Sequence, residues 1–475
     1  MEEGGEKRKQ KLRIVLVPWV FQGHINPMFL LASILHEKGF SITLAHAEFT
    51  PIDPTSHPHF SFIPLPDGFS GPDVGISFGS FLNFHSAINT KIESLLLDRL
   101  GREIDDESGA EKIACIIYDT IFCNVESAAH RLGIPSVSLH TSSATCLRVH
   151  LNLPDLQSYI PIPDGFGDEI APGLDPLRFK DLDILLAPHV QEMLPFVAKT
   201  SNVTTAAAVI LNTGSCLEQA SLEEIKKKCG GGGAIPVFAP GPLFKLAPSA
   251  SASSSLLEEN TDCLKWLDRQ APDSVIYISM GSLVRIETDE FKELAHALAD
   301  SEQPFLWVVR PDLLQGEAGT TAAVIERLPE KVKRVILEEE RGMVVEWAPQ
   351  KEVLAHKAVG GFLSHCGWSS TVESMGEGVP MICRPGFGDQ WVNARYVSAV
   401  WGAGLELGGG NRKALERGEI EAAIKKVMSG KLGEEMRKKA GDMKSKIESS
   451  IVKGGSSYND LDSFVQFILS LQQPN

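Results

Sequence analysis

Residues 347–390 read WAPQKEVLAHKAVGGFLSHCGWSSTVESMGEGVPMICRPGFGDQ, and their pattern is the most informative in the chain. Its run Val359–Leu363 is short, apolar and opened by glycine, which is typical of a buried parallel strand. A small polar loop follows at Ser364–Ser370, and Thr371–Glu377 has the composition of a helix. A strand, a glycine-containing loop and a helix N-terminus form an anion site, because free backbone N–H groups and the positive end of the helix dipole face the ligand.

Polar side chains of the same stretch suit a ligand that carries a diphosphate and a sugar. His365, Ser369 and Ser370 are hydrogen-bond donors for phosphate oxygens. Glu373 lies one turn into the predicted helix, where its carboxylate can accept from a ribose diol, and Trp347 offers a flat indole for a nucleobase. Each residue alone is equally compatible with a role in the core or at a helix start, so the combination carries the prediction.

The last two residues of the stretch, Asp389 and Gln390, offer donors and acceptors for sugar hydroxyls. Taken in order, residues 347–390 closely resemble the donor-binding box of the plant secondary-product UDP-glycosyltransferases, which has the same length of 44 residues. The residues in register are Trp347, Pro349, Gln350, His356, Gly361, His365, Cys366, Gly367, Trp368, Ser370, Glu373, Gly378, Val379, Pro380, Asp389 and Gln390.

The resemblance implies a donor-binding set and a donor sugar. Gln390 at the end of the box, with Trp368 earlier in it, favours UDP-glucose. Two positions depart from the family: Ser369 replaces the usual Asn, so we expect weaker donor affinity, and Arg384 stands where an aromatic or small residue is usual, with its role open. The donor-binding residues that the resemblance adds are Thr141, Ser282, Ala348, Gln350, Gly367 and Trp368.

A histidine and an aspartate in the first half form a candidate catalytic pair. His24 lies in a loop between the apolar run Leu12–Pro18 and a predicted helix at Met28–Lys38, and Asp119 directly follows the apolar run Ile113–Tyr118. Carboxyl ends of parallel strands meet at one edge of a sheet, where ligands bind. The carboxylate would orient the imidazole as a general base, and the nearby helix N-terminus would keep it neutral. Taken alone, a histidine in a loop is more often structural, and the aspartate is equally compatible with a helix cap.

Apolar residues near this pair suggest a pocket for a lipophilic acceptor. Cys146 and His150 are four residues apart on a predicted helix and share a face, which is also compatible with simple packing. FQGHINP near the start and GGSSY near the end resemble the subgroup of steviol-glycoside glucosyltransferases, whose acceptors include flavonoids, other phenolics, benzoxazinoids and diterpenoids. The predicted acceptor-binding residues are Trp19, Phe21, Phe84, Ile121, Phe122, Cys146, His150 and Gly388.

Strands alternate with helices twice along the chain, which predicts an α/β fold with two doubly wound, Rossmann-like domains facing across a cleft. The resemblance identifies this as the GT-B fold. We expect an acceptor-binding domain at residues 1–245, a linker at 246–261 (LAPSASASSSLLEENT) and a UDP-sugar-binding domain at 262–455. By resemblance, the helix in 456–475 packs back on the first domain. The charged segment 312–341, with its Gly/Thr/Ala tract, predicts a surface excursion.

Composition narrows the class of protein. The 475 residues suffice for two or three domains, and 43% hydrophobic and 22% charged residues are ordinary for a globular chain. The net charge of −16 disfavours nucleic acid as a partner. Eight cysteines without a Cys-x-x-Cys pair predict a reduced, cytoplasmic protein without a zinc site. The first residues, MEEGGEKRKQK, lack a signal-peptide core, and no apolar run predicts a membrane span.

These observations predict an inverting UDP-glucosyltransferase that acts as a monomer and gives a β-O-glucoside. No Asp-x-Asp motif lies near the box, so we expect neither metal nor cofactor, with Ser282, His365 and the helix N-terminus stabilising the departing diphosphate. Three other readings stay open. They are a GT-B-fold UDP-sugar epimerase, a UDP-sugar-binding protein without catalysis, and a glycoside hydrolase, which needs two carboxylates flanking a bond.

Overall fold

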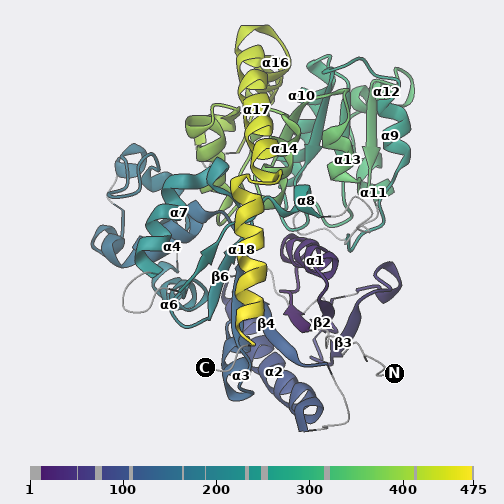
Figure 1. Cartoon of the computed structure of the whole chain (residues 1–475). Helices are drawn as coiled ribbons and strands as arrows, with labels where there is room; N and C mark the ends of the chain where they lie inside the picture. The colour runs from purple at the N-terminus through teal and green to yellow at the C-terminus, as the bar shows by residue number, and fades with distance from the viewer. Residues whose placement is uncertain are drawn as a thin grey trace.

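Two parallel β-sheets, one from each half of the chain, organise the molecule (Figure 1). The computed structural model describes residues 12–50, 52–69, 78–105, 111–162, 165–187, 189–229, 235–247, 255–314, 321–410 and 414–472. The start of the predicted linker and its end belong to these ranges, but its central part, residues 248–254, lies outside the described residues, as do residues 1–11.

The first sheet has seven strands in the order β3-β2-β1-β4-β5-β6-β7, and all pairings are parallel. Its strands are apolar because helices cover both faces, which leaves no solvated side for polar residues. The strands are β1 (Arg13–Val17), β2 (Ser41–Ala47), β3 (Ser61–Leu65), β4 (Ile113–Asp119), β5 (Ser136–His140), β6 (Ala208–Leu211) and β7 (Val237–Phe238).

The second sheet has six strands in the order β10-β9-β8-β11-β12-β13, again all parallel. The sequence predicted β8, β9 and β11 but not β10, β12 and β13, which are short and, in β10 and β13, begin with glycine, so that they do not stand out as apolar runs. The strands are β8 (Val275–Ser279), β9 (Phe305–Val308), β10 (Gly342–Val345), β11 (Val359–Ser364), β12 (Met381–Cys383) and β13 (Gly404–Glu406).

Helices connect successive strands in both halves. Those of the first half are α1 (Gln22–Glu37), α2 (Phe78–Asp105), α3 (Asn124–Arg131), α4 (Ala144–Leu156), α5 (Asp183–Leu186), α6 (Val190–Thr200), α7 (Ser215–Cys229) and α8 (Leu243–Leu246). Those of the second half are α9 (Asp262–Leu267), α10 (Thr288–Asp300), α11 (Thr321–Glu326), α12 (Glu330–Leu337), α13 (Gln350–Ala355), α14 (Trp368–Glu377), α15 (Gln390–Arg395), α16 (Arg417–Met428) and α17 (Gly430–Ile451).

The final helix, α18 (Ser456–Ser470), returns to the first sheet (Figure 1). Its buried residues Leu461, Phe464 and Ile468 share one core cluster with β1 and β4 residues such as Ile14. The backbone N–H of Ala239, just after β7, donates to the carboxylate of Asp460 at 3.0 Å. The last helix of the chain therefore completes the core of the first half.

The segment 312–341 corrects one prediction from the sequence. We expected a surface excursion because the segment is rich in charge. In the structure α12 lies within it, and Leu313, Leu328, Val332 and Val335 are buried in the core of the second half. Its charges occupy the outer face of an amphipathic helix, a pattern that composition alone does not separate from a loop. Residues 315–320, which hold part of the Gly/Thr/Ala tract, lie outside the described residues.

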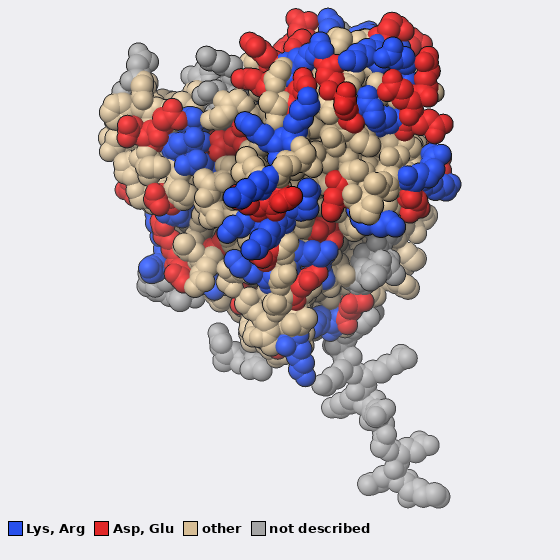
Figure 2. All heavy atoms as spheres, turned by 90° about the horizontal axis from the view of Figure 1, so that it is seen from above, with Lys and Arg blue, Asp and Glu red and all other residues tan. Residues whose placement is uncertain are grey.

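The surface carries charges of both signs. On the face in Figure 2, acidic and basic side chains alternate, and its described residues form no continuous basic area of the kind that binds a polyanion. Among the described helices, none is both long and apolar enough to span a membrane.

Candidate active site

Each sheet has one point where the strand order reverses, and the predicted site residues follow the strands at these points. In the first sheet β1 lies between β2 and β4, and in the second β8 lies between β9 and β11. Connections from neighbouring strands diverge there, which opens a crevice beyond the carboxyl ends. His24 follows β1 and Asp119 ends β4, while His365 follows β11.

His24 and Asp119 form a hydrogen-bonded pair. Nδ1 of His24 lies 2.8 Å from Oδ2 of Asp119, whose side chain is fully buried. The other carboxylate oxygen of Asp119 accepts from the backbone N–H of Ile121 at 2.9 Å, and Oγ1 of Thr141 lies 2.8 Å from the same Nδ1. Because an ionised carboxylate only accepts hydrogen bonds, the proton of neutral His24 sits on Nδ1 and leaves Nε2 unprotonated.

The helix around His24 begins earlier than its sequence suggested. The sequence predicts a loop at Phe21–Pro27 and a helix start at Met28. Instead α1 begins at Gln22, and the backbone carbonyl of Phe21 accepts from the N–H groups of His24 and Ile25. His24 is therefore held in a first helical turn rather than in a loop.

Burial and charge act in opposite directions on His24. Desolvation disfavours the imidazolium, but the adjacent Asp119 carboxylate outweighs it and raises the pKa of His24 above its usual value. We expected the helix N-terminus to lower this pKa, and the carboxylate reverses that expectation. Burial also raises the pKa of Asp389, across the cavity, to about 6, against the opposing effects of Asn393 and His24.

A cavity of about 410 Å³ joins the two halves at these strand ends. Its volume is in the range of sites for small organic ligands. Asp119 lies behind His24 and does not line the cavity. The predicted catalytic and donor-binding residues that line it are His24, Thr141, Ser282, Trp347, Ala348, Gln350, His365, Gly367, Trp368, Ser369, Ser370, Glu373, Asp389 and Gln390.

The predicted acceptor-binding residues divide into two groups. Phe21, Ile121, Cys146, His150 and Gly388 line the cavity. Trp19, Phe84 and Phe122 do not, which corrects the prediction for these three. They are 3% exposed or less and pack against one another in the core, with the rings of Trp19 and Phe122 4.7 Å apart.

The sequence missed much of the apolar wall, which comes from α4, α5 and α6 with their flanking residues. Its members are Val149, Leu182, Ile184, Met193, Phe196 and Val197. Burial lowers the pKa of His150 to about 4 and raises that of Cys146, so both side chains are neutral at pH 7. These wall residues are thus apolar and uncharged. They are scattered over three helices and their flanking residues, and no sequence pattern marks their positions.

The start of α14 lies where the sequence predicted a helix N-terminus for an anion site, with one difference. The helix begins at Trp368, directly after Gly367, so Ser369 and Ser370 lie in its first turn rather than in the preceding loop. Their backbone N–H groups are therefore among those without a partner inside the helix.

Gln350 orients the polar side chains next to this helix. Its Nε2 donates to Oγ of Ser370 at 2.9 Å and to Oε2 of Glu373 at 2.7 Å. Burial raises the pKa of Glu373 to about 7, despite the hydrogen bond from Gln350. Glu373 thus changes between a neutral and an ionised form near neutral pH.

His365 is packed between two glycines. A Cβ atom on Gly281 or on Gly367 would lie 2.4 or 2.5 Å from the imidazole ring, so neither position accepts a side chain. Gly281 also has a φ of +65°, in the left-handed region that favours glycine. Burial, assisted by the charge of Arg310, lowers the pKa of His365 to about 4. His365 can therefore serve as a neutral hydrogen-bond donor.

Arg310 is a buried cation that the sequence reading missed. It lies two residues after the end of β9 and is 2% exposed. Its guanidinium donates to the backbone carbonyls of Gly281 and Val284 and to the carboxylate of Asp312. It braces the loop that carries Ser282. The available signal was an arginine placed at the carboxyl end of the apolar run FLWVV.

Arg384, whose role the sequence left open, anchors another loop of the cavity. It donates through Nε and Nη2 to both carboxylate oxygens of Glu290, each at 2.7 Å. The next residues, up to Gly388, line the cavity in part, and the side-chain oxygen of Gln390 accepts from the backbone N–H of Gly386. Among the described residues, no group of three or more His, Cys, Asp or Glu side chains could hold a metal ion.

Comparison with known proteins places this geometry in context. Residues 255–439 match the family described as UDP-glucoronosyl and UDP-glucosyl transferase. The chain is 41% identical over 476 residues to flavonol 3-O-glucosyltransferase UGT76E12 of Arabidopsis thaliana, covering 98% of this chain and 99% of the relative. It is 40% identical to UDP-glycosyltransferase 76E1 of Solanum lycopersicum, covering 98% and 94% of the two chains.

Solved structures confirm the predicted GT-B architecture. UGT2 of Phytolacca americana, complexed with UDP-2fluoro-glucose and pterostilbene, superposes with a TM-score of 0.79 at 26% identity, covering 97% of this chain and 100% of that one. UGT71G1 of Medicago truncatula, complexed with UDP-glucose, gives a TM-score of 0.77 at 26% identity, with 96% and 98% covered.

Proposed function

Because the chain belongs to the plant UDP-glycosyltransferases, we propose that it transfers glucose from UDP-glucose to a hydroxyl group of a small lipophilic metabolite. The observation that carries the proposal is the His24–Asp119 pair, 2.8 Å apart, at a cavity whose opposite wall holds the donor box. The first half would bind the acceptor and the second half the UDP-sugar.

The reaction begins at the acceptor hydroxyl. Nε2 of His24 takes the hydroxyl proton as the oxygen attacks the anomeric carbon of glucose. Asp119 stabilises the imidazolium that forms, because its carboxylate is buried and already hydrogen-bonded to Nδ1. General base catalysis of this kind contributes about 10²–10⁴-fold in rate.

The bond between the anomeric carbon and the diphosphate breaks on the opposite side, and its electron pair goes to the departing UDP. His365, Ser282, Ser369, Ser370 and the N-terminus of α14 would stabilise that charge through hydrogen bonds. Attack opposite the leaving group inverts the anomeric centre, so an α-linked donor gives a β-glucoside.

The acceptor is a flavonoid, another phenolic, a benzoxazinoid or a diterpenoid in this proposal. The uncharged wall formed by Val149, Leu182, Met193 and Phe196 favours a flat or compact apolar body over an ionic one. Among these classes we favour flavonols, because a flavonol 3-O-glucosyltransferase is 41% identical to this chain.

The test incubates the purified chain with radiolabelled UDP-glucose and a panel of flavonols, simple phenols and diterpenoid alcohols. We expect labelled β-glucoside with wild type and none with His24→Ala. Thermal stability and UDP affinity of the variant should match wild type, since His24 faces the acceptor. Bound UDP-glucose without any product across the panel would instead indicate a binding protein. Conversion of the donor to another UDP-hexose would indicate an epimerase.

A further inference from the structure

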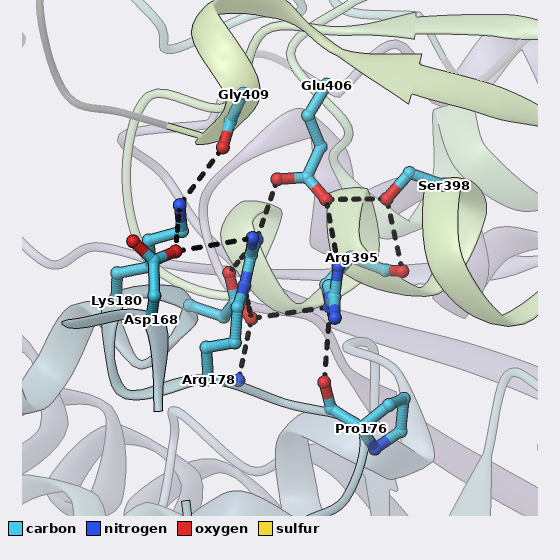
Figure 3. Close-up of polar contacts among 9 residues, drawn as sticks. Asp168, Pro176, Arg178, Lys180, Arg395, Ser398, Glu406 and Gly409 are labelled. Carbon is cyan, nitrogen blue, oxygen red and sulfur yellow. Dashed lines mark hydrogen bonds and ion pairs between the residues drawn. The ribbon is translucent and has the colours of Figure 1, made fainter. Parts of the chain in front are cut away.

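One segment of the first half is held by the second half. This segment, residues 168–184, lies between α4 and α6 and is called the strap here. It contains a short 3₁₀ turn, η5 (Phe179–Asp181), and the start of α5. Figure 3 shows its polar side chains pointing toward β13 and the end of α15.

An ion cluster joins the strap to the second half. Nη2 of Arg178 donates to Asp181 at 2.7 Å and to Glu406, on β13, at 2.8 Å. Arg395, the last residue of α15, donates to the backbone carbonyl of Pro176 at 3.1 Å and lies 3.7 Å from the carboxylate of Asp181. Arg178, Arg395, Asp181 and Glu406 thus alternate in charge across the two halves, and Asp168 and Lys180 of the strap extend the network on its outer side (Figure 3).

The cluster is largely shielded from water. The side chain of Asp181 is 1% exposed, that of Glu406 10% and that of Arg178 12%. The cost of removing such charges from water offsets most of their attraction, so a cluster like this adds little net stability. Its charge-assisted hydrogen bonds nevertheless have short lengths and fixed directions, and they fix the position of the groups that carry them.

The strap continues directly from the cluster into the cavity wall. Leu182, Asp183 and Ile184, which follow Asp181, all line the cavity. The carboxylate of Asp183 accepts from the backbone N–H of Gly388 at 2.6 Å, one residue before Asp389. The strap therefore contacts the second half at the cluster, through Nζ of Lys180, which donates to the backbone carbonyl of Gly409 at 3.1 Å, and beside the donor-binding end of the box.

The same cluster also holds the far end of the helix that starts at the donor site. Helix α15 begins at Gln390 and ends at Arg395, and Ser398 after it donates to Glu406 at 2.6 Å. One set of charges consequently fixes the acceptor wall at Leu182–Ile184 and the helix that carries Gln390. The distance between the bound acceptor and the donor sugar depends on the positions of this wall and of this helix.

We propose that Arg178, Asp181, Arg395 and Glu406 are positioning residues that set the acceptor wall against the donor site and thereby determine which hydroxyl of an acceptor reaches glucose. This inference rests on the proposed function. Its consequence is that residues of both halves of the chain determine acceptor specificity. The residues act through the strap and contact neither substrate.

The test compares Glu406→Gln, Arg178→Met and the double variant with wild type. The probe acceptor is quercetin, which has several hydroxyl groups. We expect the KM for quercetin to rise about tenfold and the ratio of its glucosides to change, because a misplaced wall presents other hydroxyls. The Kd for UDP should stay within about twofold, since neither Arg178 nor Glu406 lines the cavity. The double variant should be no worse than Arg178→Met alone.

Lys245→Met is the matched control. Lys245, on α8, pairs with Glu377 at the end of α14, so this pair also joins the two halves and is similarly buried. It does not touch the strap. We expect wild-type KM and product ratio for this variant.

A second readout does not depend on transfer. Hydrogen exchange of strap amides at residues 178–184 should accelerate in Glu406→Gln and stay at the wild-type rate in Lys245→Met. Unchanged product ratios and exchange rates in the cluster variants would overturn the inference, as would equal effects of Lys245→Met. Failure of the proposed function would look different, because wild type itself would then form no glucoside.

Discussion

At the scale of single residues, the proposed reaction makes the proton affinity of His24 set the pH range of transfer. Only neutral imidazole can act as a base, and Asp119 raises the pKa of His24 above its usual value. The rate should therefore fall as pH decreases through this raised pKa. Asp119→Asn removes the charge that outweighs burial, so the pKa of His24 should fall and the acidic limb of kcat/KM should move to lower pH.

The Asp119→Asn variant should also lose about 10²–10⁴-fold in kcat, because the imidazolium loses its stabilisation. The measurement is a pH profile of kcat/KM with quercetin from pH 5 to 9 for both proteins. An acidic limb that stays in place in the variant would show that another group titrates.

Glu373 predicts pH-dependent nucleoside binding. Its pKa of about 7 leaves a mixture of forms at neutral pH, and only the carboxylate accepts from both hydroxyls of a ribose diol. Uridine affinity should rise by up to about tenfold between pH 6 and pH 8, as the ionised fraction rises. Uridine is the probe because the phosphate of UDP titrates in the same range. Calorimetry should show this rise in wild type and a flat profile in Glu373→Gln; parallel profiles would contradict the assignment.

The position of Arg310 predicts that its replacement weakens binding of the diphosphate of the donor but not binding of the nucleoside. Its guanidinium holds the carbonyls of Gly281 and Val284, and its charge lies behind the loop that carries Ser282. Arg310→Met should weaken UDP binding by about tenfold or more, as expected for a charged hydrogen-bonding group. Uridine binding should not change. Arg310→Lys keeps the positive charge but loses the several N–H donors of the guanidinium, so its UDP affinity should lie between those of wild type and Arg310→Met. An equal loss for uridine would reduce Arg310 to a packing role.

The location of single residues at the cavity was predictable where a sequence motif fixed both the residue types and their order along the chain. Every donor-binding residue assigned from the box lines the cavity. Trp19, Phe84 and Phe122 were not placed correctly, because an aromatic residue near a strand end can face the core or the pocket, and periodicity does not tell which. Arg310 lies outside the box, and its function depends on carbonyls nearly thirty residues away in the chain.

At the scale of elements, the packing of α18 against the first sheet can be tested by comparing a buried and an exposed residue of this helix. Phe464 is fully buried against the first sheet, with its ring 5.3 Å from that of Phe238, whereas Leu469 on the same helix is 41% exposed. Phe464→Ala should lower stability by about 3–5 kcal/mol, and Leu469→Ala by under about 0.5 kcal/mol. Melting temperatures from differential scanning calorimetry would compare the two. Equal shifts would mean that the helix does not pack as described.

Helix centres were easier to predict than helix starts. Helices α10 and α16 match their expected bounds, because charged and apolar residues alternate at helical spacing throughout them. Helices α1 and α14 both begin several residues early, and their first turns hold His24, Ser369 and Ser370. Backbone carbonyls of the preceding residues stabilise such starts, and a carbonyl has no signature in the sequence.

At the scale of the whole molecule, ligand binding should stabilise both halves together. The cavity and α18 link them, so we expect one cooperative transition. UDP at one hundred times its Kd should add about 2.7 kcal/mol. Tryptophan fluorescence reports mainly on the second half, which holds six of the seven tryptophans, and far-UV circular dichroism reports on both. Both signals should shift by the same temperature; a UDP-insensitive step in circular dichroism alone would contradict the coupling.

The architecture as a whole was predictable because alternating strands and helices recur twice with a polar, low-complexity stretch between them. The strap was not. Its contacts with β13 and α15 join residues more than two hundred positions apart, and a charged residue in a Pro- and Gly-rich loop looks the same whether it faces water or another domain.

The position of α18 has a consequence for biosynthesis. The strands that carry His24 and Asp119 are translated before α18, which covers part of their sheet, so the nascent chain must keep an apolar strip uncovered until that helix has been made. A premature stop codon just before Ser456 would spare every cavity residue in the sequence and still leave that strip bare. Such a truncated product should depend on chaperones and be degraded rather than accumulate as a working enzyme.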